Sequence, residues 1–444
     1  MKISLITSLA SSVSESSGYI AQCVQSKRPI NISFMGIFVI ITILVVITAV
    51  FAYINTRVLK LPETIGMMII SIVFSVFLII IGLVFPLVSG FAKNFIDSID
   101  FSKVLLDIML SFLLFAGALH TDRSLLKANR NSITVFAIAG VLLSTLLIGL
   151  ILYLLFQLFH TPVIFLYCLL FGALVAPTDP IAVLGILTKA GAPKDVEIKI
   201  VGESLFNDGI GVVLFLSLFQ IITIGGENIS SWEISVLLIK EIGGGILFGW
   251  LLGLVGYRMM KKIDHYQTEI LITLAMVMGG YMLAQWLHIS GPLAMVVAGL
   301  FTGSRSKEQA MSNTTGLYID KFWELIDVLM NAILFVLIGL ELLTLEFNLN
   351  YLLTGLVAIP VTLFARYISL LLPASLFKRF IKTDKKTVWL MTWGGLRGGL
   401  SIAMALSLTD PLPKDQFVFM IYIIVLFSII VQGLTVGKLV KRLF

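Results

Sequence analysis

The sequence predicts an all-α polytopic membrane protein with about thirteen transmembrane helices. Of the 444 residues, 58% are hydrophobic and only 13% are charged, whereas roughly a quarter of a typical soluble domain is charged. A mean hydropathy of +1.04 leaves too little polar surface to cover a soluble protein of this length. The net charge of +6 is explained below by the positions of basic residues in loops, so no nucleic-acid partner is expected.

Thirteen apolar runs are candidates for bilayer-crossing helices, each of which needs about 20 mainly apolar residues. The predicted spans are residues 35–54, 61–88, 104–120, 132–157, 163–188, 198–224, 233–258, 268–287, 291–304, 322–342, 350–375, 387–409 and 416–437. Residues 1–33 precede the first span and are interpreted as an N-terminal extension.

Basic residues alternate between the two sides of the predicted membrane. Of the 31 Lys and Arg residues, 22 lie in loops that follow odd-numbered spans or in the C-terminal tail, and 6 lie on the opposite side. Cytoplasmic loops of membrane proteins are enriched in Lys and Arg. The distribution therefore predicts a cytoplasmic C-terminus and an N-terminus outside.

Seven ionisable residues within the apolar runs stand out, because ionised groups in the middle of a bilayer are costly and usually mark a pathway or an ion pair. They are Asp179, Glu203, Asp208, Lys240, Glu241, Arg366 and Arg397. The adjacent Lys240 and Glu241 lie nearer the outer end of their span, which favours a structural or interfacial role for them.

The sixth span contains the stretch GESLFNDGIG, which places Glu203, Ser204, Asn207 and Asp208 in a helix that is otherwise apolar. At 100° per residue these four side chains fall within an arc of about 140° on one face. Polar stripes can simply join helices in a membrane. Two carboxylates on one stripe favour a cation or proton site instead.

The fifth and twelfth spans both contain sequences that break helices. In APTDPIAV, Pro177 and Pro180 flank Asp179, and proline removes a backbone donor and clashes with the preceding turn. In WGGLRGGL, four glycines surround Arg397. The two spans run in opposite directions, and such a pair indicates an inverted-repeat transporter. Spans 1–6 and 8–13 would be the repeats, and span 7 would link them.

The buried charges can be paired so that one carboxylate is left over. Arg366 needs an anion, for which Glu203 is a candidate, and Arg397 can compensate either Asp179 or the carbonyl ends of the broken helices. Asp208 then remains unpaired. An unpaired carboxylate can hold a proton or a cation but not both, and that competition gives coupled exchange.

The motifs APTDPIAV, GESLFNDGIGVVLF and GLRGGLSIAMALSL resemble those of the bacterial NhaP-type members of the monovalent cation/proton antiporter-1 family, and the resemblance extends from about residue 35. It implies crossed interrupted helices in spans 5 and 12, a homodimer and a location in the bacterial inner (cytoplasmic) membrane. It also implies a dimerisation panel at about 35–120 and 268–342, an ion-binding core at about 132–224 and 350–437, and a linking span at about 233–258.

The resemblance also implies roles for individual residues. The transported Na⁺ (or Li⁺) would be bound by Asp208, Ser204 and Thr178, with the proton competing for Asp208. The residues that would organise this site are Asn207, Glu203, Asp179, Arg366 and Arg397. Since Asn207 stands where electrogenic relatives have a second aspartate, exchange is expected to be electroneutral.

The predicted function is Na⁺/H⁺ antiport by alternating access, with the cation, the proton and membrane lipid as partners and no cofactor. K⁺/H⁺ exchange by the same machinery stays open, because the side chains do not decide the ion radius. An ion channel is disfavoured because no repeated filter loop is present. The acidic face around Asp208 would repel anions, which disfavours an anion symporter. An enzyme is also disfavoured, because the predicted spans contain no catalytic dyad and no pair of zinc ligands.

Overall fold

The computed structural model describes residues 34–85, 90, 93, 95–96, 99–159, 163–224, 231–306, 311–345, 347–381, 383–409 and 412–444. The expected N-terminal extension, residues 1–33, lies outside this part of the chain. The chain divides into two units, residues 1–46 and 47–444. The described part of the first unit is the beginning of helix α2 (Phe34–Ile54), and all later elements belong to the second unit.

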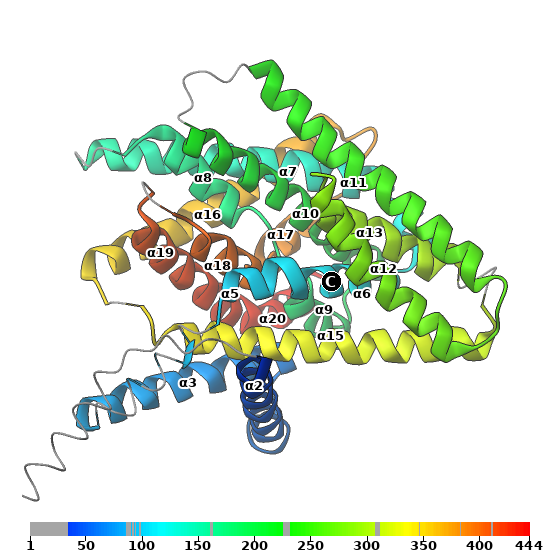
Figure 1. Ribbon diagram of the computed structural model, residues 1–444. Helices are drawn as coiled ribbons and strands as arrows, with labels where there is room; N and C mark the ends of the chain where they lie inside the picture. Colours follow the sequence, from blue (N-terminus) through cyan, green and yellow to red (C-terminus); the bar gives the residue numbers. More distant parts are fainter. Residues whose placement is uncertain are drawn as a thin grey trace, which may run out of the picture. The chain divides into compact units, whose positions relative to one another are not determined.

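All regular structure in the described residues is helical (Figure 1), as predicted. After η1 (Asn55–Leu59), the helices and π-helical segments are α3 (Glu63–Val84), α5 (Phe101–Lys103), η2 (Val104–Met109), α6 (Leu110–Leu119), α7 (Arg123–Leu158), α8 (Phe165–Val175), α9 (Ile181–Ala190), α10 (Lys194–Ile224), α11 (Ser231–Met260), α12 (Tyr266–Trp286), α13 (Gly291–Phe301), η3 (Thr302–Ser306), α15 (Asn313–Glu341), α16 (Leu349–Leu376), α17 (Lys385–Gly394), α18 (Gly399–Leu406), α19 (Lys414–Phe427), η4 (Ser428–Gln432) and α20 (Gly433–Leu443).

Within the described ranges, ten helical runs are long and apolar enough to cross a membrane, which makes the chain a multi-pass membrane protein. The other three predicted spans are built from shorter helices: α8 with α9, α13 with η3, and α17 with α18. The total of thirteen crossings stays a prediction.

Two helices begin nine residues before the spans predicted from hydropathy, α7 at Arg123 and α15 at Asn313. Each has a polar first turn that a hydropathy window misses, and each is capped by a side chain. The Asp122 carboxylate accepts hydrogen bonds from the Ser124 hydroxyl and the Leu125 amide. These bonds hold the pKa of Asp122 below its usual range, so the cap stays ionised at neutral pH.

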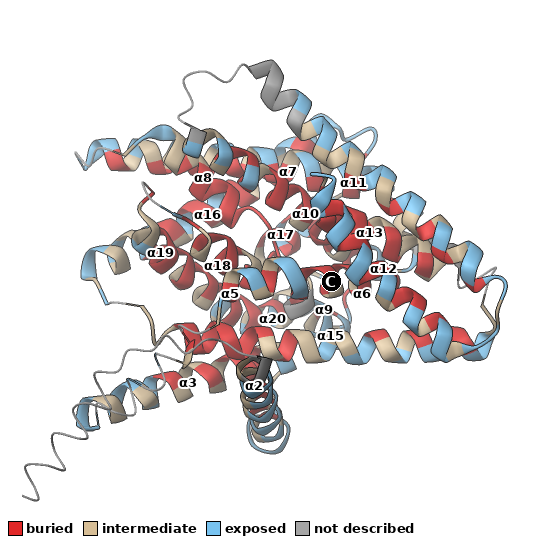
Figure 2. Cartoon of the chain, viewed as in Figure 1, coloured by how far each residue is buried: buried red, intermediate tan, exposed pale blue. Residues whose placement is uncertain are grey.

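The interrupted helices lie in the interior of the large unit. α7 packs against α8, α10 and α16, whereas α15 packs against α3, α6 and α12. Buried side chains gather on α10, α17 and α18 (Figure 2). Along α11 the exposed side chains include Ile239, Leu247 and Trp250. An exposed apolar face of this kind suits contact with lipid.

Candidate functional site

The two predicted helix breaks lie against each other. α8 ends at Val175 and α9 begins at Ile181, while α17 ends at Gly394 and α18 begins at Gly399. Between these ends the chain is not helical, and the Asp179 amide donates to the Leu396 carbonyl at 2.7 Å in an isolated antiparallel bridge. The predicted interruption of both spans is therefore confirmed, and the breaks bring Asp179 and Arg397 to the same place in the fold.

Protein donors satisfy carbonyl groups that the breaks expose, as a membrane interior requires. Arg397 Nη1 donates to the carbonyl of Ala176 at 2.5 Å and to that of Pro177 at 2.8 Å. Gln432 Nε2 donates to the carbonyl of Trp393 at 2.8 Å. The cationic Arg397 thus lies at the C-terminus of α8, where the helix dipole favours positive charge. The carbonyl end of a broken helix is one of the two partners predicted for Arg397.

Gly398 allows the second break to approach the first. A Cβ atom at this position would lie 2.6 Å from Asp179 Oδ2 and 2.8 Å from Asp179 Cβ. Neither distance is tolerable without movement, so any larger residue would push the two breaks apart.

We expect Gly398→Ala to reduce ion transport by at least about tenfold, because overpacking of this size costs about 1–3 kcal/mol at the junction of the breaks. The measurement is the initial rate of cation-dependent proton flux in proteoliposomes. Gly185→Ala is the matched control: Gly185 lines the same cavity as Asp179, and a Cβ there meets nothing within 4 Å. Equal rates for the two variants would contradict the close approach.

Glu203 and Arg366 form a buried ion pair with fork geometry. Arg366 Nη1 donates to Glu203 Oε1 at 2.8 Å, and Nη2 donates to Oε2 at 2.6 Å. Both residues are 1% exposed. The structure thus contains the pair that charge counting predicts, and it joins α10 to α16. Bidentate pairs of this kind fix geometry as well as compensating charge.

Asn207 connects this ion pair to the first break. Its Nδ2 donates to Glu203 Oε1 and to Thr178 Oγ1, both at 2.8 Å, and its Oδ1 accepts from the Thr178 amide at 3.2 Å. Both amide hydrogens and the amide oxygen are therefore used. The hydroxyl oxygens of Thr178 and Ser204 lie 2.9 Å apart. A continuous polar network thus runs from Arg366 to the backbone of the interrupted span.

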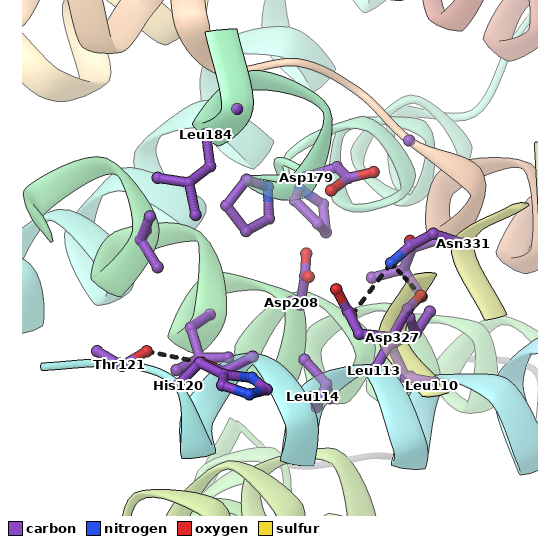
Figure 3. Close-up of a pocket in the computed structure, with 18 of the residues that line it drawn as sticks. Leu110, Leu113, Leu114, His120, Thr121, Asp179, Leu184, Asp208, Asp327 and Asn331 are labelled. Carbon is purple, nitrogen blue, oxygen red and sulfur yellow. Dashed lines mark hydrogen bonds between the residues drawn. The ribbon is translucent and has the colours of Figure 1, made fainter. Parts of the chain in front are cut away.

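Asp208 differs from these neighbours because it faces a cavity of about 700 Å³. It is partly exposed, and within the described residues it makes no hydrogen bond or ion pair. Asp179 lines the same cavity (Figure 3). The predicted ligands Thr178 and Ser204 do not line it: they are fully buried beside it. The cavity offers a cation direct access to Asp208 and no direct access to the two hydroxyls.

The ionised groups of the network leave one negative charge. Glu203 is compensated by Arg366, and the remaining groups are the Asp179 and Asp208 carboxylates and the Arg397 guanidinium. Carboxylates thus exceed guanidinium groups by one. A single proton or monovalent cation would neutralise the set, which a low-dielectric interior favours strongly.

Comparison with known proteins shows to which family the chain belongs. A family described as the transmembrane region of sodium/hydrogen exchangers matches residues 45–442. The chain belongs to the sodium/hydrogen exchanger family. The match includes both helix breaks and the Glu203–Asp208 stretch, so the site lies within the family's transmembrane region.

Two similar members of the family are bacterial antiporters. The Na⁺/H⁺ antiporter NhaP of Pseudomonas aeruginosa is 46% identical over 407 residues, covering 90% of this chain and 95% of the relative. The Na⁺/H⁺ antiporter NhaG of Bacillus atrophaeus is 35% identical over 82% of this chain and 68% of the relative. The comparison confirms the resemblance in the sequence and the prediction of a transporter rather than an enzyme.

A solved structure supports the fold. The sodium proton antiporter MjNhaP1 of Methanocaldococcus jannaschii superposes with a TM-score of 0.72 at 22% identity, covering 92% of this chain and 99% of that chain. The predicted all-helical antiporter fold is therefore confirmed at the level of architecture.

Three polar residues that line the cavity and do not belong to the site predicted from the sequence matter most for the argument below. They are Asp327 and Asn331 on α15 and Ser401 on α18. The first two have a signal in the sequence: a carboxylate and an amide four residues apart on one helix face, the same spacing as Glu203 and Asn207. That spacing alone does not reveal which helix α15 faces, so the cavity becomes visible only in the fold.

A second cavity of about 280 Å³ lies beyond the first. Leu110 lines both cavities. Val212 and Met404 line the second, and they follow Asp208 and Ser401 by one helical turn on α10 and α18. The two cavities are therefore separated by about one turn of each helix and by the Leu110 side chain.

Proposed function

We propose that this protein exchanges Na⁺ (or Li⁺) for H⁺ across the membrane in an electroneutral cycle. The observation that carries the proposal is the state of Asp208: it faces a cavity, and no described hydrogen bond or ion pair satisfies it. The Glu203 carboxylate, both Nη groups of Arg366 and the Asn207 amide, by contrast, are hydrogen-bonded to one another or to Thr178. The similarity to relatives named Na⁺/H⁺ antiporters adds support.

In this mechanism one carboxylate binds either substrate. Deprotonated Asp208 holds the cation, and Ser204 and Thr178 approach to supply hydroxyl oxygens, which suit a hard monovalent ion. A proton at Asp208 displaces the cation, because only one charge is needed to neutralise the site. Asn207 holds Glu203 and Thr178 in place through its hydrogen bonds. Because Asn207 carries no charge, one proton at Asp208 replaces one cation.

Alternating access would use the barrier between the two cavities. The lining of the large cavity includes Asp122 and Lys194, which follow odd-numbered spans and are predicted to be cytoplasmic. The structure then corresponds to an inward-facing state. A movement that separates Val212 and Met404 from Leu110 would open Asp208 toward the second cavity and the opposite side.

The same proposal places the protein in its membrane. Positive loops put the C-terminus in the cytoplasm and the N-terminus outside, in the inner membrane of a bacterium. A second copy of the chain would pack against the panel at about 35–120 and 268–342. The mobile core, at about 132–224 and 350–437, would then carry Asp208 past a fixed dimer.

The test is ion selectivity and charge balance in proteoliposomes containing the purified full chain. An imposed Na⁺ or Li⁺ gradient should drive proton movement that a pH-sensitive dye reports, and an equal K⁺ gradient should drive much less. Setting the membrane potential with a K⁺ ionophore should leave the Na⁺-driven rate unchanged if exchange is electroneutral. Equal rates with K⁺ would refute the Na⁺ selectivity, and a rate that follows the potential would refute the one-for-one stoichiometry.

A further inference from the structure

The carboxylate of Asp327 lines the same cavity as Asp208. Asp327 and Asn331, one turn apart on α15, both line the large cavity. In Figure 3 their side chains extend from α15 toward the region that Asp208 and Asp179 face. Within the described residues Asp327 makes no ion pair, and its one described side-chain hydrogen bond comes from Asn331. A carboxylate thus faces the transport cavity without a cation.

The orientation of the Asn331 amide is fixed by Asp327. Asn331 Nδ2 donates to the Asp327 carbonyl at 2.8 Å and to Asp327 Oδ1 at 3.1 Å. Flipping the amide would set its oxygen against two acceptors, so this assignment is forced. Among the described residues Oδ1 is consequently left without a hydrogen-bond partner, although Asn331 is only 5% exposed. An unsatisfied buried acceptor costs free energy unless a water or a cation occupies the position beside it.

Another oxygen without a partner lies in the same cavity wall. Ser401 on α18 is 1% exposed and lines the cavity, and its Oγ has no hydrogen-bond partner in the described part of the chain. α15 packs against α18. The lining of one cavity therefore includes two buried oxygen atoms, and a carboxylate that makes no ion pair, for which the described residues supply no further partner. Each is an atom that a hard cation accepts as a ligand.

We propose that Asp327, Asn331 and Ser401 form a second cation site, which holds an incoming, partly hydrated alkali cation before it passes to Asp208. One carboxylate with neutral oxygens suits a monovalent ion. The inference deepens the proposed function and rests on it for the direction of transfer. The binding itself does not depend on transport, so the two can fail separately. A structural role alone, in which Asn331 and Asp327 only stabilise α15, predicts no cation binding.

Direct binding separates these interpretations. Radioactive Na⁺ binding is measured on the purified full chain with Asp208→Asn, which removes the first site. The proposal predicts residual saturable Na⁺ binding in this variant and its loss when Asp327→Asn or Asn331→Ala is added. Glu324→Gln is the matched control, since Glu324 is an exposed acid on the same helix and in the same cavity wall. No residual binding, or equal loss with Glu324→Gln, would overturn the second site.

Transport measurements on variants that keep Asp208 test the second site independently. Asp327→Asn should raise the Na⁺ concentration for half-maximal exchange by about tenfold, because a cation in a cavity is attracted strongly by one nearby charge. The maximal rate should change by less than about twofold, and Asp327→Glu should restore most of the apparent affinity. An unchanged half-maximal concentration would refute the site. If the wild-type protein shows no Na⁺/H⁺ exchange, the proposed function fails, whereas the binding experiment still decides on the second site.

Discussion

The Asp208→Asn variant is expected to lose all Na⁺-dependent proton flux in everted vesicles and in proteoliposomes. Asparagine has the same shape as aspartate, but it carries no charge for the cation and no titrating proton. The neighbouring network should survive, because its described hydrogen bonds do not include Asp208. The loss should therefore come without a loss of folded protein, as judged by size-exclusion chromatography.

Asp415→Asn is the control for this variant. Asp415 is an exposed acid in the first turn of α19 and does not line the large cavity, so its removal changes net charge without touching the site. It should exchange at the wild-type rate. Exchange by Asp208→Asn at more than a few per cent of that rate would show that another group carries the proton.

Competition between Na⁺ and H⁺ for one carboxylate can also be measured on the wild-type protein. Protons inhibit cation binding by occupying Asp208, so raising Na⁺ should move the pH of half-maximal inhibition downward. With Na⁺ above its dissociation constant, each tenfold increase should shift that pH by about one unit, as simple mass action requires. A pH profile that does not move with Na⁺ would place the proton and the cation on different groups.

The fold was predictable where local covalent chemistry decides the structure. Pro177 and Pro180 cannot continue a helix, and the glycines around Arg397 weaken one, so the breaks follow from the residues themselves. The need of Arg366 for an anion also follows from the sequence, because a buried guanidinium must be compensated, and Glu203 is a candidate for that role. These inferences need no knowledge of which helix lies beside which.

The rest of the site depends on helix neighbours, which hydropathy does not specify. The bridge from Asp179 to Leu396 joins residues more than two hundred positions apart. The burial of Ser204 depends on how α10 is rotated, and the burial of Thr178 depends on how the break between α8 and α9 packs against α10. Asp327 and Asn331 lie within the predicted span 322–342, but their spacing does not tell which neighbouring helix they face. The predicted contacts of Asp208 with the two hydroxyls stay a prediction for the cation-bound state.

Breaking the Glu203–Arg366 pair should produce the largest loss of stability. Both side chains are almost completely buried, and removing one partner of a buried pair costs about 3–5 kcal/mol because the other charge is left uncompensated. Glu203→Gln should cost more than Arg366→Gln. Glutamate can take up a proton and become neutral when its partner is absent, whereas arginine stays charged. The measurement is the free energy of unfolding of each purified variant in detergent micelles.

The double variant, Glu203→Gln with Arg366→Gln, separates the structural role of the pair from its role in transport. With both charges removed no buried ion is stranded, so we expect much of the lost stability to return. Transport should stay impaired, because the fork that fixes Glu203 Oε1 for Asn207 is gone and the first break loses its support through Thr178. The exposed Lys321–Glu324 pair provides the reference, and Glu324→Gln there should cost less than about 1 kcal/mol. If Glu203→Gln lowers the free energy of unfolding no more than Glu324→Gln does, the buried pair does not hold α10 to α16.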